Sequence, residues 1–165
     1  MPMNGLFPEL SDKFPCDYAG FNPVSGGHQL RISLENSLNL LSHLHKDSAF
    51  WCDYLICLSA EHIFGEKETL RLHYYLSSYT RGHQVHVWTE KETLNGEKAN
   101  FQSVSHIWKT ADWHERECAE LFGIDFENHP NPAHLLLPND WKGFPLRKNY
   151  LQQEQYHGIK LKYEK

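Results

Sequence analysis

Strict alternation between Leu70 and Ser78 constrains the fold more than any other feature of the chain. Every second position up to Leu76 is apolar, and the positions between carry Arg71, His73, Tyr75 and Ser77. Successive side chains of a β-strand point to opposite faces, so the pattern predicts a strand with one face in the core. The fold must therefore contain a sheet whose core face includes Leu70, Leu72, Tyr74 and Leu76.

Neighbouring segments predict further strands of this sheet. Residues 83–89 follow a short turn at residues 77–82, which favours an antiparallel hairpin. Residues 54–60 predict another strand, and residues 28–32 a shorter one. The expected same-face residues are Val85 with Val87, and Tyr54 with Ile56 and Leu58.

Two helices are predicted to cover the sheet. With Ser33 as N-cap, leucines recur at helical spacing, at Leu34, Leu38, Leu40, Leu41 and Leu44. A second helix of about three turns begins with an Asp-x-x-Glu capping box, Asp112 with Glu115, and ends at Phe122 before the left-handed stop Gly123. Shorter helical segments are expected around residues 9–13 and 103–108. This order of elements predicts an α+β fold, a two-layer, mostly antiparallel sheet covered on one side by helices.

Beyond Gly123 the chain has neither helical nor strand periodicity. It carries Pro130, Pro132, Pro138, Gly143 and Pro145. Irregular runs of this length are uncommon inside compact domains, and the many apolar side chains fit poorly with a disordered tail. We therefore expect residues 1–124 to form the α+β domain and residues 125–165 to form an extended arm and tail of the same domain, which contacts its own domain, a partner, or both.

Length and composition exclude several classes of protein. A chain of 165 residues is expected to form one domain with a single core. Its net charge of -5 argues against nucleic acid as a partner, and only the tail is locally basic. The apolar stretch from Phe50 to Leu58 is interrupted by Asp53 and is shorter than the roughly 18 residues of a membrane span. The N-terminus has no pattern of a secretory signal, so a cytosolic or similarly reducing compartment is expected.

Cysteine and histidine usage gives weak support for a metal or cluster. The four cysteines are Cys16, Cys52, Cys57 and Cys118, and their spacing lacks the close thiolate group of an iron–sulfur site. The chain also contains 12 histidines. The closest pairs are His83 with His86 and His43 with His45, but in each pair the side chains are expected to point apart.

The charged residues of the second helix have two interpretations. Glu115, Glu117 and Glu120 are candidate acid and base groups. Alternatively, Asp112, Arg116 and Glu120 form ion pairs at i, i+4 spacing on a solvated helix. In the arm, Arg147 and Lys148 are candidates for binding a phosphate or, preferably for Arg147, a carboxylate of a partner.

Aromatic residues are candidate anchors of the arm. Trp113, Trp141 and Phe144 are expected to pack into the domain itself or into another protein, since buried aromatic side chains dominate interface energetics. Sequence motifs for a serine nucleophile, a dinucleotide or a phosphate loop are missing. The chain also offers no recognisable site for a redox cofactor.

Several of these residues together resemble one protein family. The matching residues are Glu115-Arg116-Glu117, Glu120-Leu121-Phe122-Gly123-Ile124, His129-Pro130, Trp141, Gly143 and Pro145-Leu146-Arg147-Lys148. Their order and spacing resemble the thirty-kilodalton subunit, or C subunit, of proton-pumping NADH:quinone oxidoreductase, and a looser match extends back to about Leu30. The chain departs from the family pattern at Cys118-Ala119, at Phe144, where a His is common, and at Asn149, where an Asp is common.

The resemblance implies a cofactor-free structural subunit of the hydrophilic arm of respiratory complex I. The whole enzyme would pass electrons from NADH through FMN and iron–sulfur centres in other subunits to quinone, coupled to proton translocation. The partners implied are subunits D, B and I, chiefly the first, with the other two nearby. Contact with the membrane would be only through the complex, at the cytoplasmic face of a bacterial inner membrane or the equivalent matrix side in mitochondria. The residues of the motif would then tie the arm to the second helix and shape a subunit contact.

Two other functions stay open. The same scaffold serves related hydrogenases, F420H2 dehydrogenases and the photosynthetic NDH complex, whose equivalent is called subunit J. A function of a different class is a small metal-dependent enzyme that uses histidines and the carboxylates of Glu115 to Glu120.

Overall fold

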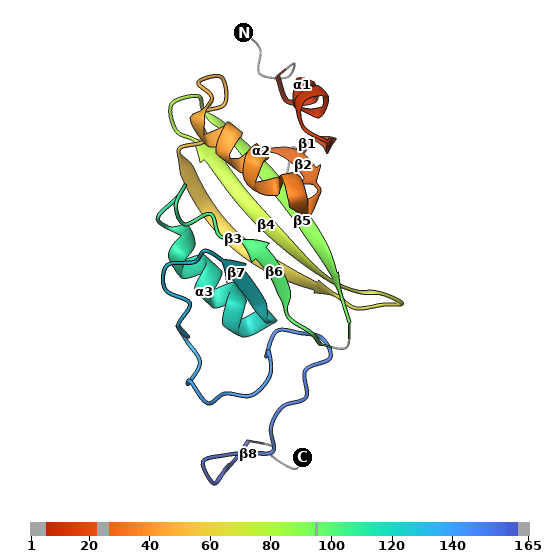
Figure 1. The fold of residues 1–165 in the computed structure, drawn as a ribbon, viewed down its shortest axis with the longest axis vertical. Coiled ribbons are helices and arrows are strands. Elements are labelled where there is room, and N and C mark those ends of the chain that lie inside the picture. The colour runs from red at the N-terminus through yellow and green to blue at the C-terminus, as the bar shows by residue number, and fades with distance from the viewer. Residues whose placement is uncertain (1–5, 23–26, 95, 162–165) are drawn as a thin grey trace.

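A five-stranded sheet forms the centre of the fold (Figure 1). The computed structural model describes residues 6–22, 27–94 and 96–161. The strands are β1 (Cys16–Asn22), β2 (Gly27–Ile32), β3 (Tyr54–Ile63), β4 (Glu68–Ser78) and β5 (His83–Thr93), in the spatial order β1-β2-β5-β4-β3. Neighbours pair antiparallel except β2 with β5, which are parallel. The prediction of a mostly antiparallel α+β fold is confirmed.

Among the described residues, three helices accompany the sheet: α1 (Leu6–Lys13), α2 (Leu34–Lys46) and α3 (Ala111–Phe122). Figure 1 shows α2 and α3 in front of the sheet. The leucines Leu40, Leu41 and Leu44 of α2 are fully buried and join the core face of β4. The predicted helix after Ser33 is therefore confirmed. It lies on the sheet because this position buries its apolar face.

The β4–β5 hairpin agrees with the alternation in the sequence. Leu76 pairs with Val85 and Tyr74 with Val87, and all four side chains are buried. The predicted face of β3 is only partly right. Leu58 is buried, but Tyr54 is 55 % and Ile56 41 % exposed. A β-bulge between Leu55 and Cys57 adds one residue to the strand and reverses the phase of the alternation, so Leu55 lies in the core instead.

The predicted helix at residues 103–108 is wrong. This segment forms a single turn, in which the N–H groups of Ile107 and Trp108 donate to the carbonyl oxygen of Val104. Ser103 and Ser105 share a hydrogen bond between their hydroxyls, and Ser103 also bonds to a carboxylate of α3. These side-chain bonds give the backbone an alternative to the helix.

A second, small sheet extends the fold beside α3. Strand β6 (Ala99–Gln102) pairs in parallel with β7 (Ile124–Glu127), so α3 is the connection between two parallel strands. The expected irregular backbone directly after Gly123 is therefore wrong for residues 124–127. The remaining residues, 128–161, are here called the C-terminal segment. They are irregular except for the short hairpin of β8 (Gln155–Tyr156) and β9 (Ile159–Lys160).

Candidate functional site: helix α3 and the C-terminal segment

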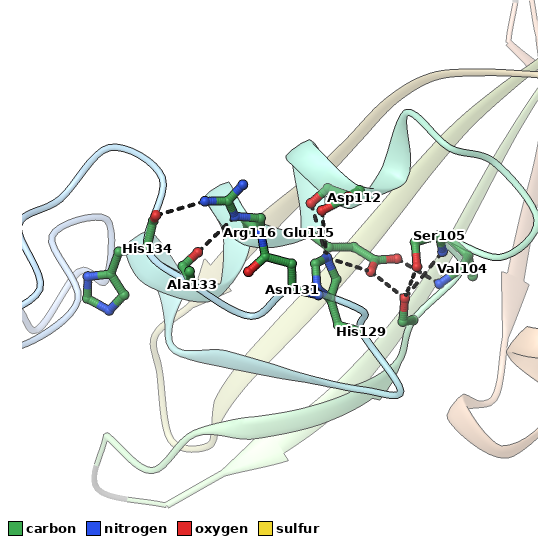
Figure 2. A network of polar contacts seen from close by, with 10 residues as sticks. Val104, Ser105, Asp112, Glu115, Arg116, His129, Asn131, Ala133 and His134 are labelled. Carbon is green, nitrogen blue, oxygen red and sulfur yellow. Dashed lines mark hydrogen bonds and ion pairs between the residues drawn. The ribbon is translucent and has the colours of Figure 1, made fainter.

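Glu115 connects α3 to the turn at residues 103–108 (Figure 2). Its side chain is completely buried and accepts hydrogen bonds from the Ser103 hydroxyl at 2.6 Å and the Val104 N–H at 2.7 Å. Burial raises the pKa of the Glu115 carboxyl to about 7, against the opposing effect of these two bonds. The predicted capping box is wrong, because Thr110 is the N-cap and Glu115 reaches the 103–108 turn instead.

His129 fixes the start of the C-terminal segment against α3. The Asn131 N–H donates to His129 Nδ1 at 3.0 Å, so the ring proton lies on Nε2. That proton points to the Asp112 carbonyl oxygen at 3.1 Å, and Nε2 lies 3.7 Å from Glu115 Oε2 (Figure 2). The His129 side chain is 2 % exposed. It therefore acts as an internal hydrogen-bonding group at this position.

Arg116 and Glu120 hold the next part of the segment through its backbone. The Arg116 guanidinium donates to the carbonyl oxygens of Ala133 at 2.8 Å and His134 at 2.9 Å (Figure 2). The Glu120 carboxylate accepts three backbone N–H groups, from Leu135, Leu136 and Leu137, at 2.9, 2.7 and 3.1 Å. One helix thus offers a cation to carbonyl groups and an anion to amide groups, which substitutes for the secondary structure that this segment lacks. The expected ion pairs between Arg116 and the helix carboxylates do not form among the described residues.

Gly123 allows the segment to return across the end of α3. Its φ of +71° closes the helix in the left-handed conformation, as predicted. A Cβ atom at this position would lie 2.5 Å from the Phe144 ring, so only glycine leaves room for that side chain. The Leu146 N–H donates to the Leu121 carbonyl oxygen at 3.0 Å just beyond this contact. Phe144 therefore packs against its own domain.

Arg147, a predicted ligand for a phosphate or a partner's carboxylate, is buried and binds groups of its own chain. It is 4 % exposed and donates to the carbonyl oxygens of Phe122 at 2.6 Å and Glu97 at 2.7 Å. A guanidinium has several donors in a fixed plane, which suits several converging carbonyl groups. Its nearest carboxylate is that of Glu68 in the same chain, at 3.6 Å.

Three further residues stabilise this arrangement and were not predicted from the sequence. They are His62, Glu68 and Ser103. The backbone N–H of Lys148 donates to His62 Nδ1 at 2.9 Å, and His62 Nε2 lies 2.9 Å from Glu68 Oε1. These contacts join positions up to 86 residues apart in the chain. No local pattern in the sequence marks such long-range partners.

The remaining motif residues lie nearer the surface. Among the described contacts, the side chains of Glu117 and Lys148 form no hydrogen bond or ion pair, and Pro130 is exposed. Trp113 is 59 % exposed and lies beneath the Arg116 guanidinium. Trp141 is half-buried beside Tyr156, and Pro145 is half-buried. The structure thus brings together Glu115, Arg116, Glu120, Gly123, His129 and Arg147 inside the chain, and leaves Glu117, Pro130 and Lys148 outside that network.

Candidate metal ligands do not converge in the part of the chain that the structure describes. There, no three His, Cys, Asp or Glu side chains are placed to hold a metal ion. A hollow of about 380 Å³ lies between α3, β7 and the C-terminal segment. The charged groups in its wall include Arg116, Glu120 and Lys98, and each is already bound within the chain. Among the described residues, none of the helices combines the length and the apolar character of a membrane span.

Comparison with known proteins shows which family the chain resembles. Residues 30–156 match the model of the family described as "Respiratory-chain NADH dehydrogenase, 30 Kd subunit". A relative from Citrifermentans bemidjiense, the C subunit of an NADH-quinone oxidoreductase, is 31 % identical over 154 residues, which cover 91 % of this chain and 92 % of the relative. Another, from Chloroherpeton thalassium and with the same name, is 40 % identical over 120 residues, covering 73 % of this chain and 48 % of the relative.

Two further matches are more limited. The J subunit of an NAD(P)H-quinone oxidoreductase from Prochlorococcus marinus is 54 % identical over 57 residues, which cover 34 % of this chain and 31 % of that protein. A chain of the membrane-bound sulfane sulfur reductase, an archaeal respiratory membrane complex, shares the fold with a TM-score of 0.69 at 17 % identity, over 82 % of this chain and 76 % of that one.

The region matched by the family model includes every residue of the network around α3. The matches with the relatives from Chloroherpeton thalassium and Chlorobium phaeobacteroides cover only 48 % and 65 % of those proteins, so this chain spans about half to two thirds of their length. The family match itself covers most of the chain, from residue 30 to residue 156. The chain therefore belongs to the family of the 30 kDa subunit of respiratory-chain NADH dehydrogenase.

Proposed function

We propose that this chain is a cofactor-free structural subunit in the hydrophilic arm of an NADH:quinone oxidoreductase. The enzyme transfers electrons from NADH through FMN and iron–sulfur centres in other subunits to quinone, and couples this transfer to proton translocation. The supporting observation is how the family motif is used. Glu115, Arg116, Glu120 and Arg147 bind backbone and side-chain groups of their own chain, which leaves them unsuited to binding a substrate.

The role of the motif in this proposal is to shape a surface for other subunits. An irregular segment bound along its backbone by charged side chains is held in one conformation, and a preformed surface loses less conformational entropy on binding than a mobile one. The segment turns apolar side chains outward, with Leu136 64 %, Leu151 87 % and Ile159 65 % exposed. Exposed apolar side chains on an ordered segment favour a protein partner.

Among the other subunits of the complex, the D subunit is the chief partner in this proposal, with the B and I subunits nearby. The chain then lies at the periphery of the membrane, on the cytoplasmic face in bacteria or the matrix side in mitochondria. A scaffold role in a related respiratory complex is the second candidate. The match to a J subunit and the fold shared with an archaeal respiratory complex favour it.

Affinity purification of the tagged chain from its native membranes in mild detergent tests the proposal. Mass spectrometry should identify NADH-binding, iron–sulfur and quinone-site subunits among the retained proteins. Recovery of hydrogenase or ferredoxin-linked subunits instead would support the second candidate. Recovery of the chain alone, under conditions that keep the rest of the complex intact, would contradict both.

A further inference from the structure

Helix α1 is attached to the fold through a small number of buried contacts. Phe7 and Leu10 are 0 % and 3 % exposed. The Phe7 ring stacks on the imidazole of His28, with ring centroids 3.9 Å apart and planes inclined by 19°. It also meets His83 edge-on, at 5.6 Å between centroids. Two histidines, from the adjacent strands β2 and β5, thus form the floor beneath α1.

The surroundings of His28 and His83 stabilise a protonated ring poorly. His28 is 4 % exposed, and its Nδ1 shares a hydrogen bond of 2.9 Å with the Tyr18 hydroxyl. His83 is 9 % exposed, and its Nδ1 is buried without a partner. The other nitrogen of His83 lies 3.7 Å from Cys52 Sγ. A protonated imidazole needs acceptors for two N–H groups. Burial raises the pKa of Cys52 to about 12, so this thiol supplies no negative charge to His83.

The charged groups around these histidines also disfavour protonation. Arg81, in the turn between β4 and β5, and His28 both lower the pKa of His83, after burial as the main cause. Burial lowers the pKa of His28 as well. No carboxylate in the described residues forms an ion pair with either ring.

His43 lies at the edge of this group of histidines, and burial and a nearby cation lower its pKa too. His43 of α2 lies against Phe14, which follows α1, and its Nε2 is 3.4 Å from Lys13 Nζ. Burial and Lys13 lower the pKa of His43, and Asp47, at 3.5 Å, opposes them. A carboxylate therefore reaches the outermost histidine, while none of the described residues supplies one to the two histidines beneath Phe7.

We propose that α1 is an acid-sensitive clasp, which is docked while His28 and His83 are neutral and is released when these rings take up protons. Attraction between a charged ring and the face of Phe7 acts against release, but it is smaller than the cost of burying the charge, above all on His83, whose Nδ1 has no acceptor. Each pKa below 6.5 in the docked state means that docking is strongest above pH 6.5 and weakens as pH falls. Every unit of difference weakens docking by up to about tenfold per histidine.

Hydrogen exchange measured on the full chain tests the clasp. Amides of residues 7–14, corrected for the intrinsic pH dependence of exchange, should lose about tenfold or more protection between about pH 7.5 and about pH 5. Amides of β4 should keep theirs. The double variant His28→Gln/His83→Gln should keep α1 protected at the lower pH. The control His106→Gln removes an exposed histidine and should behave as the unmodified chain does.

Two results would overturn the proposal: equal protection of α1 at both pH values, or the same loss of protection in the double variant. NMR titration of the unmodified chain provides a test that does not depend on folding of the variant. The imidazole signals of His28 and His83 should change at the same pH as the amide signals of α1. Titration of the rings without change in α1, or release of α1 while both rings stay neutral, would also exclude the clasp.

Discussion

The two ends of the described chain are attached to the rest of the fold by different kinds of contact. Helix α1 is held by the buried side chains of Phe7 and Leu10, and the Phe7 ring stacks on the His28 ring. The C-terminal segment is held by charged side chains, chiefly Glu120 and Arg147, that bind its backbone or reach from it to the domain. Packing is spread over many atoms, while each charged side chain carries several hydrogen bonds by itself.

Each end should therefore respond to its own kind of perturbation. The α1 contact depends on the protonation state of its floor, so we expect pH to affect it more than removal of a surface charge. The C-terminal contact depends on individual residues of α3, so we expect single substitutions there to release it. Substitutions in and around α3 can confirm or contradict this contrast.

Glu120→Ala should have the largest effect. It removes the carboxylate that accepts three backbone N–H groups, and hydrogen bonds to water will recover only part of the lost free energy. We expect the free energy of unfolding to fall by about 4 kcal/mol, since hydrogen bonds to charged groups are each worth about 1.5–3 kcal/mol. Urea unfolding measures the loss. Glu117→Ala, on the exposed face of the same helix, is the control and should change it by less than about 0.5 kcal/mol.

Gly123→Ala should destabilise the chain by about 3 kcal/mol. The left-handed backbone costs a non-glycine residue about 1–2 kcal/mol, and the contact with Phe144 adds an overpacking cost. Gly82→Ala is the matched control, because its φ is +67° but no atom lies within 4 Å of the added Cβ. Its cost should be the backbone part alone. If both variants lose the same stability, the close packing of Phe144 is not needed to hold the segment.

The pH dependence at Glu115 should oppose that of α1. The pKa of this carboxyl is about 7 in the folded chain and 4.5 ordinarily, so its contribution is fully present below pH 4.5 and is lost as pH rises through 7. The loss is at most about 3 kcal/mol in the free energy of unfolding. Glu115→Gln should remove this slope in denaturant titrations between pH 4.5 and 7. A slope that persists in Glu115→Gln would assign the pH dependence to another group.

Arg116→Ala should have the smallest effect on stability, about 1.5 kcal/mol, because its two carbonyl contacts lie near the surface. It should also reduce recovery of other subunits in the affinity purification. Arg81→Ala provides a control of similar chemistry, since Arg81 donates to the Ser48 carbonyl oxygen at the other end of the sheet. Unchanged stability and unchanged recovery in Arg116→Ala would remove the proposed role of Arg116 in holding the segment.

The elements predicted from sequence are those with a local cause. Strands β4 and β5 follow the alternation of their side chains, α2 follows its leucines, and α3 ends at Gly123. The face of β3 was mispredicted because a bulge is set by pairing with β4, and the turn at residues 103–108 because its backbone and hydroxyl groups bind a carboxylate of α3. A sequence pattern reports interactions between residues a few positions apart. The bulge in β3 and the bonds of the 103–108 turn join residues that are farther apart in the chain.

The candidate site shows the same division. The motif from Glu115 to Lys148 is recognisable in sequence, and with it the family. Which charges point inward was not predictable: Arg147 is buried and Glu117 exposed, although both are charged residues of one motif. Their environments depend on residues such as Glu97 and Glu68, which reach the site only when the sheet and the C-terminal segment have formed.

Residue types at fixed short spacing were enough to specify the periodic elements, the helix stop at Gly123 and the family. The β6–β7 pairing, the partners of the motif charges and the histidine floor beneath α1 are instead properties of the folded chain. These features join residues far apart in the chain. Their energies arise from burial and from hydrogen-bond partners, and a side chain acquires both only when distant segments meet.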